Sequence, residues 1–174
     1  NDETRLGAVQ APRLSPNFRY IAYRTPAPLT IEAIQRVGGI GGGQLPDDIM
    51  IYDRETATII PFALQPEDAS LMVSNVPDNF LARSEPVWSP DGTHLAWSEL
   101  VATDSQRLVI GDVVTGEITV ISEAIPPQYG VPAATQVDWG SAGIYVRNNS
   151  FTQDGSAILN DGFLLFAQDG TLLN

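Results

Sequence analysis

Residues that could carry chemistry are few in this chain, and the only histidine, His94, is the first to consider. A Ser-His-Asp hydrolase of the α/β type holds its nucleophile in a Gly-x-Ser-x-Gly elbow. The nearest match, around Ser141, reads Trp-Gly-Ser-Ala-Gly, so Gly140 stands directly before the serine and breaks that spacing. We therefore expect His94 to lie on a strand surface and the chain to hold no catalytic residue.

A glycine-rich run at residues 38–43, Gly-Gly-Ile-Gly-Gly-Gly, has the composition of a phosphate-binding loop. Such loops end in Lys followed by Ser or Thr, and the lysine contacts the phosphates. All nine basic residues of this chain are arginine. The absence of lysine removes that contact, and it removes Schiff-base catalysis as well. We interpret the run as a flexible loop and expect no cofactor.

Acidic residues in or beside the expected loops are the remaining candidates, because calcium binds six to eight oxygen ligands. No segment contains the Asp-x-Asp-x-Asp-Gly run of a calcium loop, and the chain has no cysteine for a thiolate site. We expect these residues to be solvated and to bind no metal. They are Asp47, Asp48, Glu67, Asp68, Asp78, Asp104, Asp154 and Asp161.

The formal net charge of −12 limits the partners of the protein. A field of that sign repels nucleic-acid phosphates and anionic membranes, and the arginines are scattered along the chain instead of gathered in a patch. No stretch approaches the roughly 18 consecutive apolar residues that a membrane-spanning helix needs. We expect no nucleic-acid partner and no membrane span.

A repeated unit must position these residues. Residues 88–97 read Trp-Ser-Pro-Asp-Gly-Thr-His-Leu-Ala-Trp, and a weaker copy at residues 14–23 reads Leu-Ser-Pro-Asn-Phe-Arg-Tyr-Ile-Ala-Tyr. Proline presets φ for a turn and glycine accepts a positive φ, so Ser89, Pro90, Asp91 and Gly92 are predicted to form the turn of a β-hairpin. We expect the side chains of Asp91 and Asp112 to cap turns.

Each copy predicts antiparallel strands. In the strongest copy they lie at residues 85–88, 93–98, 108–112 and 117–121, and in the first copy the last three lie at 20–23, 49–53 and 57–62. A third, degraded copy is predicted at 137–139, 144–146, 163–166 and 171–174. Asp53, Asp112 and Asp169 recur at nearly equal intervals, which indicates one supersecondary unit used three times. With 43% hydrophobic and 17% charged residues, the chain has the composition of a folded protein and is predicted to be all-β.

The Trp-Ser-Pro-Asp-Gly turn, followed by Leu-Ala-Trp and later by Ile-Gly-Asp, Thr-Gly and Glu-Ile-Thr-Val-Ile, resembles the WD40-like repeat of TolB-type β-propellers. The resemblance covers nearly all of residues 1–174 as one propeller segment of three four-stranded blades, at about residues 8–63, 84–122 and 136–174. It implies a propeller of usually six or more blades, commonly extracytoplasmic in bacteria, which is used for protein interaction or is fused to peptidases. The polar start at Asn1 fits a removed export signal or an artificial boundary, and export is favoured.

Three blades are too few to close a ring, because propellers typically contain 4 to 8 blades. An incomplete ring leaves the outer faces of its two end blades bare, and each would be an apolar patch of roughly several hundred Å² or more. Three possibilities remain for what covers these faces: a second copy of the chain, which would give six blades; a different subunit; or further sequence.

The long connections between the predicted strands fall on one face of the disc, at residues 25–47, 63–83, 123–135 and 148–161. Loops longer than about 12 residues are usually functional or disordered. Two of these loops hold an aromatic residue shortly after proline. Phe80 lies two residues after Asp78, which follows Pro77, and Tyr129 follows Gln128 and two prolines. A rigid loop presents an aromatic side chain at little entropic cost, so Phe80, Asp78, Tyr129 and Gln128 are the candidate partner-binding residues.

The sequence thus predicts a non-catalytic, extracytoplasmic β-propeller module for protein–protein interaction or scaffolding. A protein partner, a second copy or missing sequence would complete its ring. The alternative is the propeller part of a serine peptidase of the prolyl-oligopeptidase type that lacks its catalytic domain.

Overall fold

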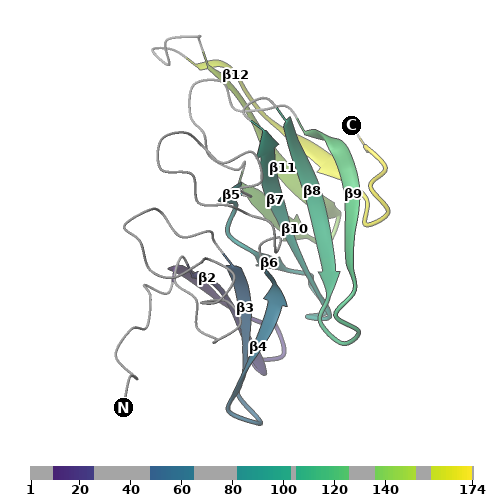
Figure 1. Ribbon diagram of the computed structural model, residues 1–174. Coiled ribbons are helices and arrows are strands. Elements are labelled where there is room, and N and C mark those ends of the chain that lie inside the picture. Colours follow the sequence, from purple (N-terminus) through teal and green to yellow (C-terminus); the bar gives the residue numbers. More distant parts are fainter. Residues whose placement is uncertain are drawn as a thin grey trace, which may run out of the picture.

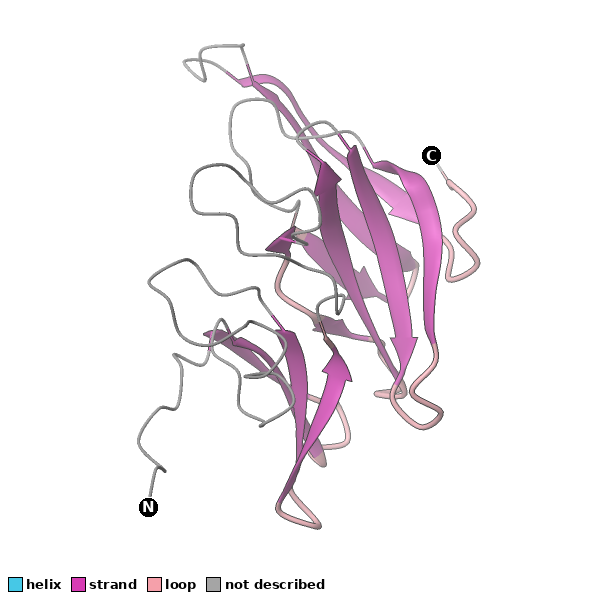
Figure 2. Cartoon of the chain, viewed as in Figure 1, coloured by secondary structure: helices cyan, strands magenta, loops and turns pink. Residues whose placement is uncertain are grey.

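The computed structural model describes residues 10–25, 48–64, 82–102, 105–125, 136–151 and 158–173. Within these ranges the chain consists of strands, turns and short irregular segments, and it contains no helix (Figure 2). No helix that could span a membrane is therefore found among the described residues.

The strands form three antiparallel sheets, one for each copy of the repeat, which we call blades 1 to 3 (Figure 1). In blade 1 each strand pairs with the next one along the chain, in the up-and-down order of a propeller blade. Its strands are β1 (Gln10–Leu14), β2 (Tyr20–Thr25), β3 (Asp48–Asp53) and β4 (Thr58–Ala63).

Blade 2 has five strands because its first strand is broken in two. Both β5 (Ala82–Arg83) and β6 (Val87–Trp88) pair with β7 (His94–Ala102), which is followed by β8 (Ser105–Asp112) and β9 (Ile118–Ile125). Pro86 lies in the gap and has no N–H to donate to a neighbouring strand. Ser84 keeps the broken edge attached, because its hydroxyl accepts a 2.9 Å hydrogen bond from the Ser98 N–H.

Blade 3 is the least regular of the three sheets. It contains β10 (Val137–Gly140), β11 (Gly143–Phe151) and β12 (Ile158–Phe166). In place of the fourth strand expected at residues 171–174 there is one bridge, between Phe166 and Leu172, and a 2.7 Å hydrogen bond from the Leu173 N–H to the Leu165 carbonyl. This pairing is shorter than the roughly 5–6 residues of an ordinary strand.

Several strands run farther than their apolar residues predicted. β9 continues to Ile125, and β11 and β12 pair along Asn148, Asn149 and Ser150. The connection between β11 and β12 is therefore residues 152–157 and not 148–161. The link from blade 1 to blade 2 is likewise shortened by β5, and the link from blade 2 to blade 3 by β9. Backbone hydrogen bonds extend an antiparallel hairpin through polar residues as well as apolar ones, so an apolar pattern underestimates its length.

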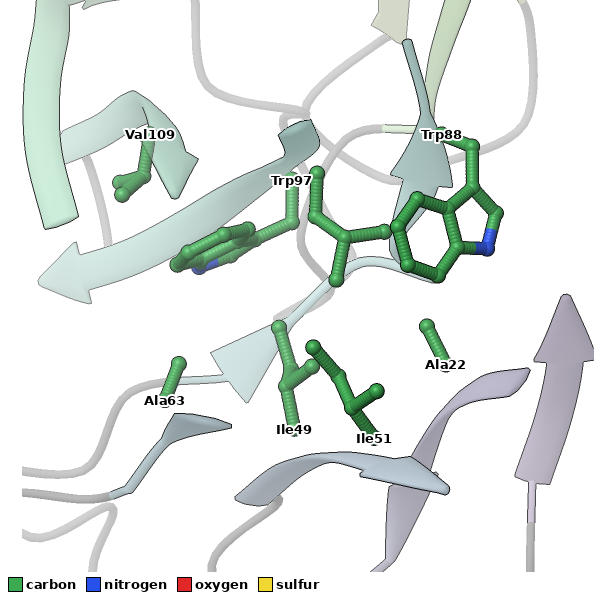
Figure 3. Close-up of a cluster of buried hydrophobic side chains, with 8 residues drawn as sticks. Ala22, Ile49, Ile51, Ala63, Trp88, Trp97 and Val109 are labelled. Atoms are coloured by element: carbon green, nitrogen blue, oxygen red, sulfur yellow. The ribbon is translucent and has the colours of Figure 1, made fainter. Parts of the chain in front are cut away.

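Blade 2 lies between the other two blades and packs a different face on each of them. One cluster joins it to blade 1: Ala22, Ile49, Ile51 and Ala63 meet Trp88, Leu95, Trp97 and Val109 (Figure 3). A second joins it to blade 3: Ala96, Leu108 and Ile110 meet Val137, Ile144, Val146 and Phe166. Successive side chains of a strand point to opposite faces, so Leu95 and Trp97 reach blade 1 while Ala96, between them, reaches blade 3.

The three sheets approach one another along their first strands, because β6 contacts both β1 and β10. Short turns connect strands at one end of each blade, which we call the turn end. The opposite end, where Thr25 pairs with Asp48 and Ile49 with Ala63, is the loop end. The predicted fold class, an incomplete ring of antiparallel propeller blades, is confirmed.

Candidate interaction surfaces

The turn at residues 89–92 is held by its own side chains. The Ser89 hydroxyl donates a 2.6 Å hydrogen bond to Asp91 Oδ1 and accepts one of 2.9 Å from the His94 N–H. Hydrogen bonds from the Ser89 hydroxyl and then from the Thr93 N–H lower the pKa of Asp91 to about 2. Gly92 adopts a φ of 72°, which side chains disfavour, and Pro90 occupies the exposed corner. These contacts stay within the hairpin.

The same turn recurs in blade 1 with asparagine in place of aspartate. The Ser15 hydroxyl donates a 2.6 Å hydrogen bond to Asn17 Oδ1 and accepts one of 2.9 Å from the Tyr20 N–H. The two turns also lie side by side, since a Cβ placed on Gly92 would be 3.3 Å from Cδ of Pro16. Successive blades therefore meet at their turn ends as well as through their cores.

The aspartates that recur at nearly equal intervals cap the third connection of their blades. Asp112 Oδ1 accepts the N–H of Val114 at 2.7 Å and that of Thr115 at 3.0 Å. The N–H groups of Thr115 and Val114 hold the pKa of Asp112 below its ordinary value. Asp53 and Asp169 accept N–H groups of the following turn in the same manner, from Glu55 and Thr171.

The ring of His94 makes a contact between blades. Its Nδ1 lies 2.7 Å from Thr93 Oγ1 and its Nε2 lies 3.9 Å from a carboxylate oxygen of Asp112. A hydrolase needs its nucleophile hydrogen-bonded to the base, whereas the Ser89 hydroxyl is engaged with Asp91. The His94 ring instead packs against Trp139 of blade 3, with centroids 6.4 Å apart.

The four residues predicted for partner binding, Phe80, Asp78, Tyr129 and Gln128, lie outside the described residues, and so does the glycine-rich run at 38–43. They stay predictions. In the part of the chain that the structure describes, no group of three or more His, Cys, Asp or Glu side chains could hold a metal ion.

A buried ion cluster, which the repeat does not predict, lies near the loop end of blade 2. Glu99 is 2% exposed, and its Oε1 accepts hydrogen bonds from Arg83 Nε at 2.7 Å and from Trp97 Nε1 at 2.9 Å. Its Oε2 accepts one from Arg107 Nε at 2.8 Å. Burial alone would raise the pKa of Glu99, but the charge of Arg83 and these hydrogen bonds outweigh it and hold the pKa below its ordinary value.

This cluster also ties blade 2 to blade 1. The guanidinium of Arg83 donates to the carbonyls of Ala63 at 2.8 Å and Leu64 at 3.1 Å, at the end of β4. In return, the Arg24 guanidinium donates to the Arg83 carbonyl. The placement of Trp97 and Glu99 two residues apart on one strand, hence on one face, is the only sign of this cluster in the sequence.

Each blade has a rear face toward the preceding blade and a front face toward the following one. In blade 2 the rear face carries Trp88, Leu95 and Trp97, which pack on blade 1. Its front face carries Leu108 and Ile110, which pack on blade 3. The strand registers identify the corresponding positions on the rear face of blade 1 and the front face of blade 3. Among the described residues, no further blade packs on these two faces.

The rear face of blade 1 carries a row of apolar side chains at the turn end. In register across the four strands, the row is Leu14, Ile21, Tyr52 and Ile59. Leu14 pairs with Ile21 as Trp88 pairs with Leu95, yet Leu14 is 46% exposed and Trp88 only 8%. Tyr23 and Met50, in the next row, are buried, so the exposed part of this face lies at the turn end.

The front face of blade 3 shows the same contrast. Phe163, Leu108 and Ile49 occupy the same position in the third strands of blades 3, 2 and 1. Their partners on the second strands are Arg147, Ser98 and Arg24, respectively. Leu108 and Ile49 are fully buried against the following blade, whereas Phe163 is 61% exposed. Leu173, beside the same edge, is 51% exposed. These two end faces are the candidate interaction surfaces of the described residues.

No protein-family model matches the sequence, and the comparison with curated proteins found no match. Solved structures are similar. TolB from Acinetobacter baumannii matches with a TM-score of 0.55 and 14% identity, over 95% of this chain and 31% of TolB. The acylaminoacyl peptidase of Pyrococcus horikoshii matches with a TM-score of 0.55 and 14% identity, over 98% of this chain and 25% of the peptidase.

The β-propeller domain of the trilobed protease from Pyrococcus furiosus, described as having an open velcro topology, also has a TM-score of 0.55 and 14% identity. That match covers 95% of this chain and 41% of the domain. The chain therefore spans less than half the length of each of these proteins. Identities this low show the fold alone, and that fold is a partial β-propeller.

Proposed function

We propose that this chain is a non-catalytic β-propeller module that acts by binding protein. It forms one propeller segment, with blades at about residues 8–63, 84–122 and 136–174. The rear face of blade 1 and the front face of blade 3 contact the partner, and the loop residues Phe80, Asp78, Tyr129 and Gln128 are candidates for a second contact. The observation that carries the proposal is that Phe163 is exposed at a position where Leu108 and Ile49 are fully buried.

Physical chemistry favours a protein as the ligand of these faces. Covering a Phe or Leu side chain stabilises a complex by roughly 1.5–3 kcal/mol. The exposed residues are apolar and lie on rigid strands, which is typical of protein interfaces. A face of this kind offers few of the polar groups that would orient a small substrate.

The binding role predicts a difference between two matched substitutions. Phe163→Ala should change the free energy of unfolding of the isolated chain by less than about 0.5 kcal/mol, because an exposed side chain supports little of the fold. Leu108→Ala, at the equivalent buried position, should cost about 2–5 kcal/mol. Denaturant titrations at low protein concentration measure both values. Equal losses in the free energy of unfolding would show that Phe163 stabilises the fold and is not kept exposed for binding.

The absence of catalysis is tested with chromogenic acylaminoacyl and prolyl peptides. We expect no hydrolysis by the purified chain above that of its His94→Ala variant, because the Ser89 hydroxyl is engaged in its turn. Hydrolysis that His94→Ala abolishes would overturn the non-catalytic part of the proposal.

The second candidate is the propeller part of a serine peptidase of the prolyl-oligopeptidase type. The similarity to the Pyrococcus horikoshii acylaminoacyl peptidase supports it, because this chain covers only 25% of that enzyme. The complete reading frame of the gene separates the two functions. A Gly-x-Ser-x-Gly elbow with later Asp and His codons supports the peptidase, whereas only further Trp-Ser-Pro-Asp-Gly copies support the binding module.

We also propose that the protein works outside the cytoplasm, as the resemblance of its repeat to that of TolB-type propellers suggests. Fractionation of cells that express the complete gene from its own promoter tests this. The protein should appear in the periplasmic or secreted fraction, and recovery from the cytoplasm alone would contradict the proposal.

A further inference from the structure

Building on this proposed function, we propose that the protein covering both end faces is a second copy of this chain. The front face of blade 3 in each copy packs on the rear face of blade 1 in the other. Two such junctions close a ring of six blades around a two-fold axis, and six lies within the range of 4 to 8 blades that propellers use. Three copies would give nine blades, which lies outside it.

The chain already contains both halves of the junction. The rear face of blade 2 packs on the front face of blade 1, and the rear face of blade 1 repeats its apolar positions, with Leu14 at the position of Trp88 and Ile21 at that of Leu95. The front face of blade 3 repeats the front face of blade 2, with Phe163 at the position of Leu108. A junction between copies thus continues the packing seen twice within one copy.

Side-chain size at the turn end distinguishes this junction from the two within the chain. At the junction of blades 1 and 2, Tyr20 stacks on Trp88 with centroids 6.1 Å apart. At the junction of blades 2 and 3, His94 packs against Trp139. Gly143 holds the position of Tyr20 and His94 in blade 3, and Leu14 holds that of the tryptophans in blade 1. At the junction between copies, a smaller residue would therefore replace the ring on both sides, so this end of the contact would be less filled than at the two junctions within the chain.

An arginine occupies the same register position on the front faces of blades 1 and 3. Arg147 pairs with Phe163 in the register that Arg24 has with Ile49. The Arg24 guanidinium crosses to the next blade and donates to the Arg83 carbonyl there. Arg147 holds the corresponding position at the front of blade 3. Front and rear faces differ, so the contact is head-to-tail, and such contacts either close into a ring or grow into a fibre.

The test measures the mass of the 174-residue chain in solution by light scattering and sedimentation, over a series of concentrations. We expect a dimer, with twice the 18.7 kDa of one chain. Leu14→Glu and Phe163→Glu should each weaken dimerisation at least tenfold, while circular dichroism confirms that both variants stay folded. Val114→Glu is the matched control, because Val114 is 80% exposed in a turn away from both end faces and its substitution should leave the dimer intact.

Mixing the two variants separates head-to-tail packing from other dimers. In a dimer of either variant with itself, each of the two junctions contains one glutamate. In the mixture, one junction joins the intact rear face of Phe163→Glu to the intact front face of Leu14→Glu, so heterodimers should form. A dimer joined by two rear faces or by two front faces would leave one of the two variants fully dimeric by itself.

Two results would overturn the second copy as partner: a wild-type chain that is monomeric at every concentration, or a dimer that both glutamate variants leave intact. Oligomers that grow without limit would overturn the closed ring. The proposed function fails by different results, namely hydrolysis that depends on His94 or a loss of stability in Phe163→Ala equal to that in Leu108→Ala. A monomer that passes those tests would leave a different protein, or further sequence of the same polypeptide, as the cover of the end faces.

Discussion

Asp91 and Asn17 occupy the same position in the repeat and share two contacts, so the turn needs a hydrogen-bond acceptor more than it needs a charge. Each side chain accepts from a serine hydroxyl and from the N–H two residues farther along the chain, which belongs to Thr93 in blade 2 and to Arg19 in blade 1. Asp91 also accepts a 2.8 Å hydrogen bond from the Thr93 hydroxyl. The sequence alone predicted the turn and the capping role of Asp91.

Replacing Asp91 tests this reading of the turn. Asp91→Asn should leave the free energy of unfolding at neutral pH nearly unchanged, because Asn17 shows that an amide oxygen accepts the same hydrogen bonds. Asp91→Ala removes the acceptor and should destabilise by about 1 kcal/mol. Urea titration of both variants measures the difference, and equal effects would mean that the carboxylate charge is what the turn requires.

Glu99 predicts a pH dependence of stability. The folded state holds the pKa of Glu99 below its unfolded value, so the ionised carboxylate stabilises the fold above the ordinary glutamate pKa of about 4.3. That contribution is lost as the pH falls through the lower pKa of the folded state. Glu99→Gln leaves Arg83 buried without its anion and should cost about 3–5 kcal/mol at pH 7.

The cost of Glu99→Gln should shrink as the pH is lowered below the ordinary glutamate pKa of about 4.3, because the unfolded wild-type chain then takes up a proton and the stability contributed by ionised Glu99 is lost. Chemical denaturation at several pH values follows the difference between wild type and variant. Glu117→Gln, at an exposed position, is the control and should show little difference at any pH. A cost for Glu99→Gln that does not change with pH would contradict a charged Glu99 in the folded state.

At the scale of elements, blade 1 approaches blade 2 closely where Phe62 of β4 contacts β7 and β8. Phe62 lies edge-on to Trp97, with centroids 6.2 Å apart, and its ring covers the space in front of Gly111. A Cβ on Gly111 would lie 2.5 Å from Cζ of Phe62, closer than such atoms approach in folded proteins. The glycine therefore allows one blade to approach the other.

Gly111→Ala should destabilise the chain by about 1–3 kcal/mol, because the Phe62 ring must move out of the junction. Phe62→Leu should recover part of this loss, and the coupling in a double-mutant cycle measures the contact directly. Gly116→Ala provides the comparison for a glycine with no atom within 4 Å of its Cβ position, although its φ of 75° adds backbone strain. If the effects of Gly111→Ala and Phe62→Leu are additive, the two residues do not contact each other in solution.

The elements also show where sequence patterns reach their limit. The hairpins around Ser89 and Ser15 were predictable because Pro, Gly and an acceptor side chain specify the turn locally. The extension of β11 and β12 through Asn148, Asn149 and Ser150 was not, because it depends on backbone pairing that their side chains do not encode. The break between β5 and β6 coincides with Pro86, which has no N–H to donate. The sequence shows this proline, but not which strand its backbone would face.

At the scale of the whole molecule, charge opposes association of the chain with itself. Each copy carries a net charge of −12, so two copies repel each other at low ionic strength. The proposed ring is held by apolar faces, which salt does not weaken. The dissociation constant of the dimer should therefore decrease several-fold as the ionic strength rises from about 0.01 M to 0.15 M, where the screening length falls from about 30 to 8 Å.

Sedimentation at a series of salt concentrations measures this dependence. The Val114→Glu control should follow the wild type, shifted slightly toward weaker binding by its added charge. Dissociation of the dimer as salt is added would contradict an apolar junction, because it would indicate that pairs of opposite charge hold the copies together.

The amino-acid sequence by itself determined the all-β class, the three copies of the blade and the capped turns, because these depend on local periodicity and on residues a few positions apart. The tertiary structure decided which face of each strand meets which blade. It also brought Arg83, Glu99 and Arg107 together and left Phe163 exposed where Leu108 is buried. Those features depend on how sheets stack, and stacking joins residues that are far apart in the chain.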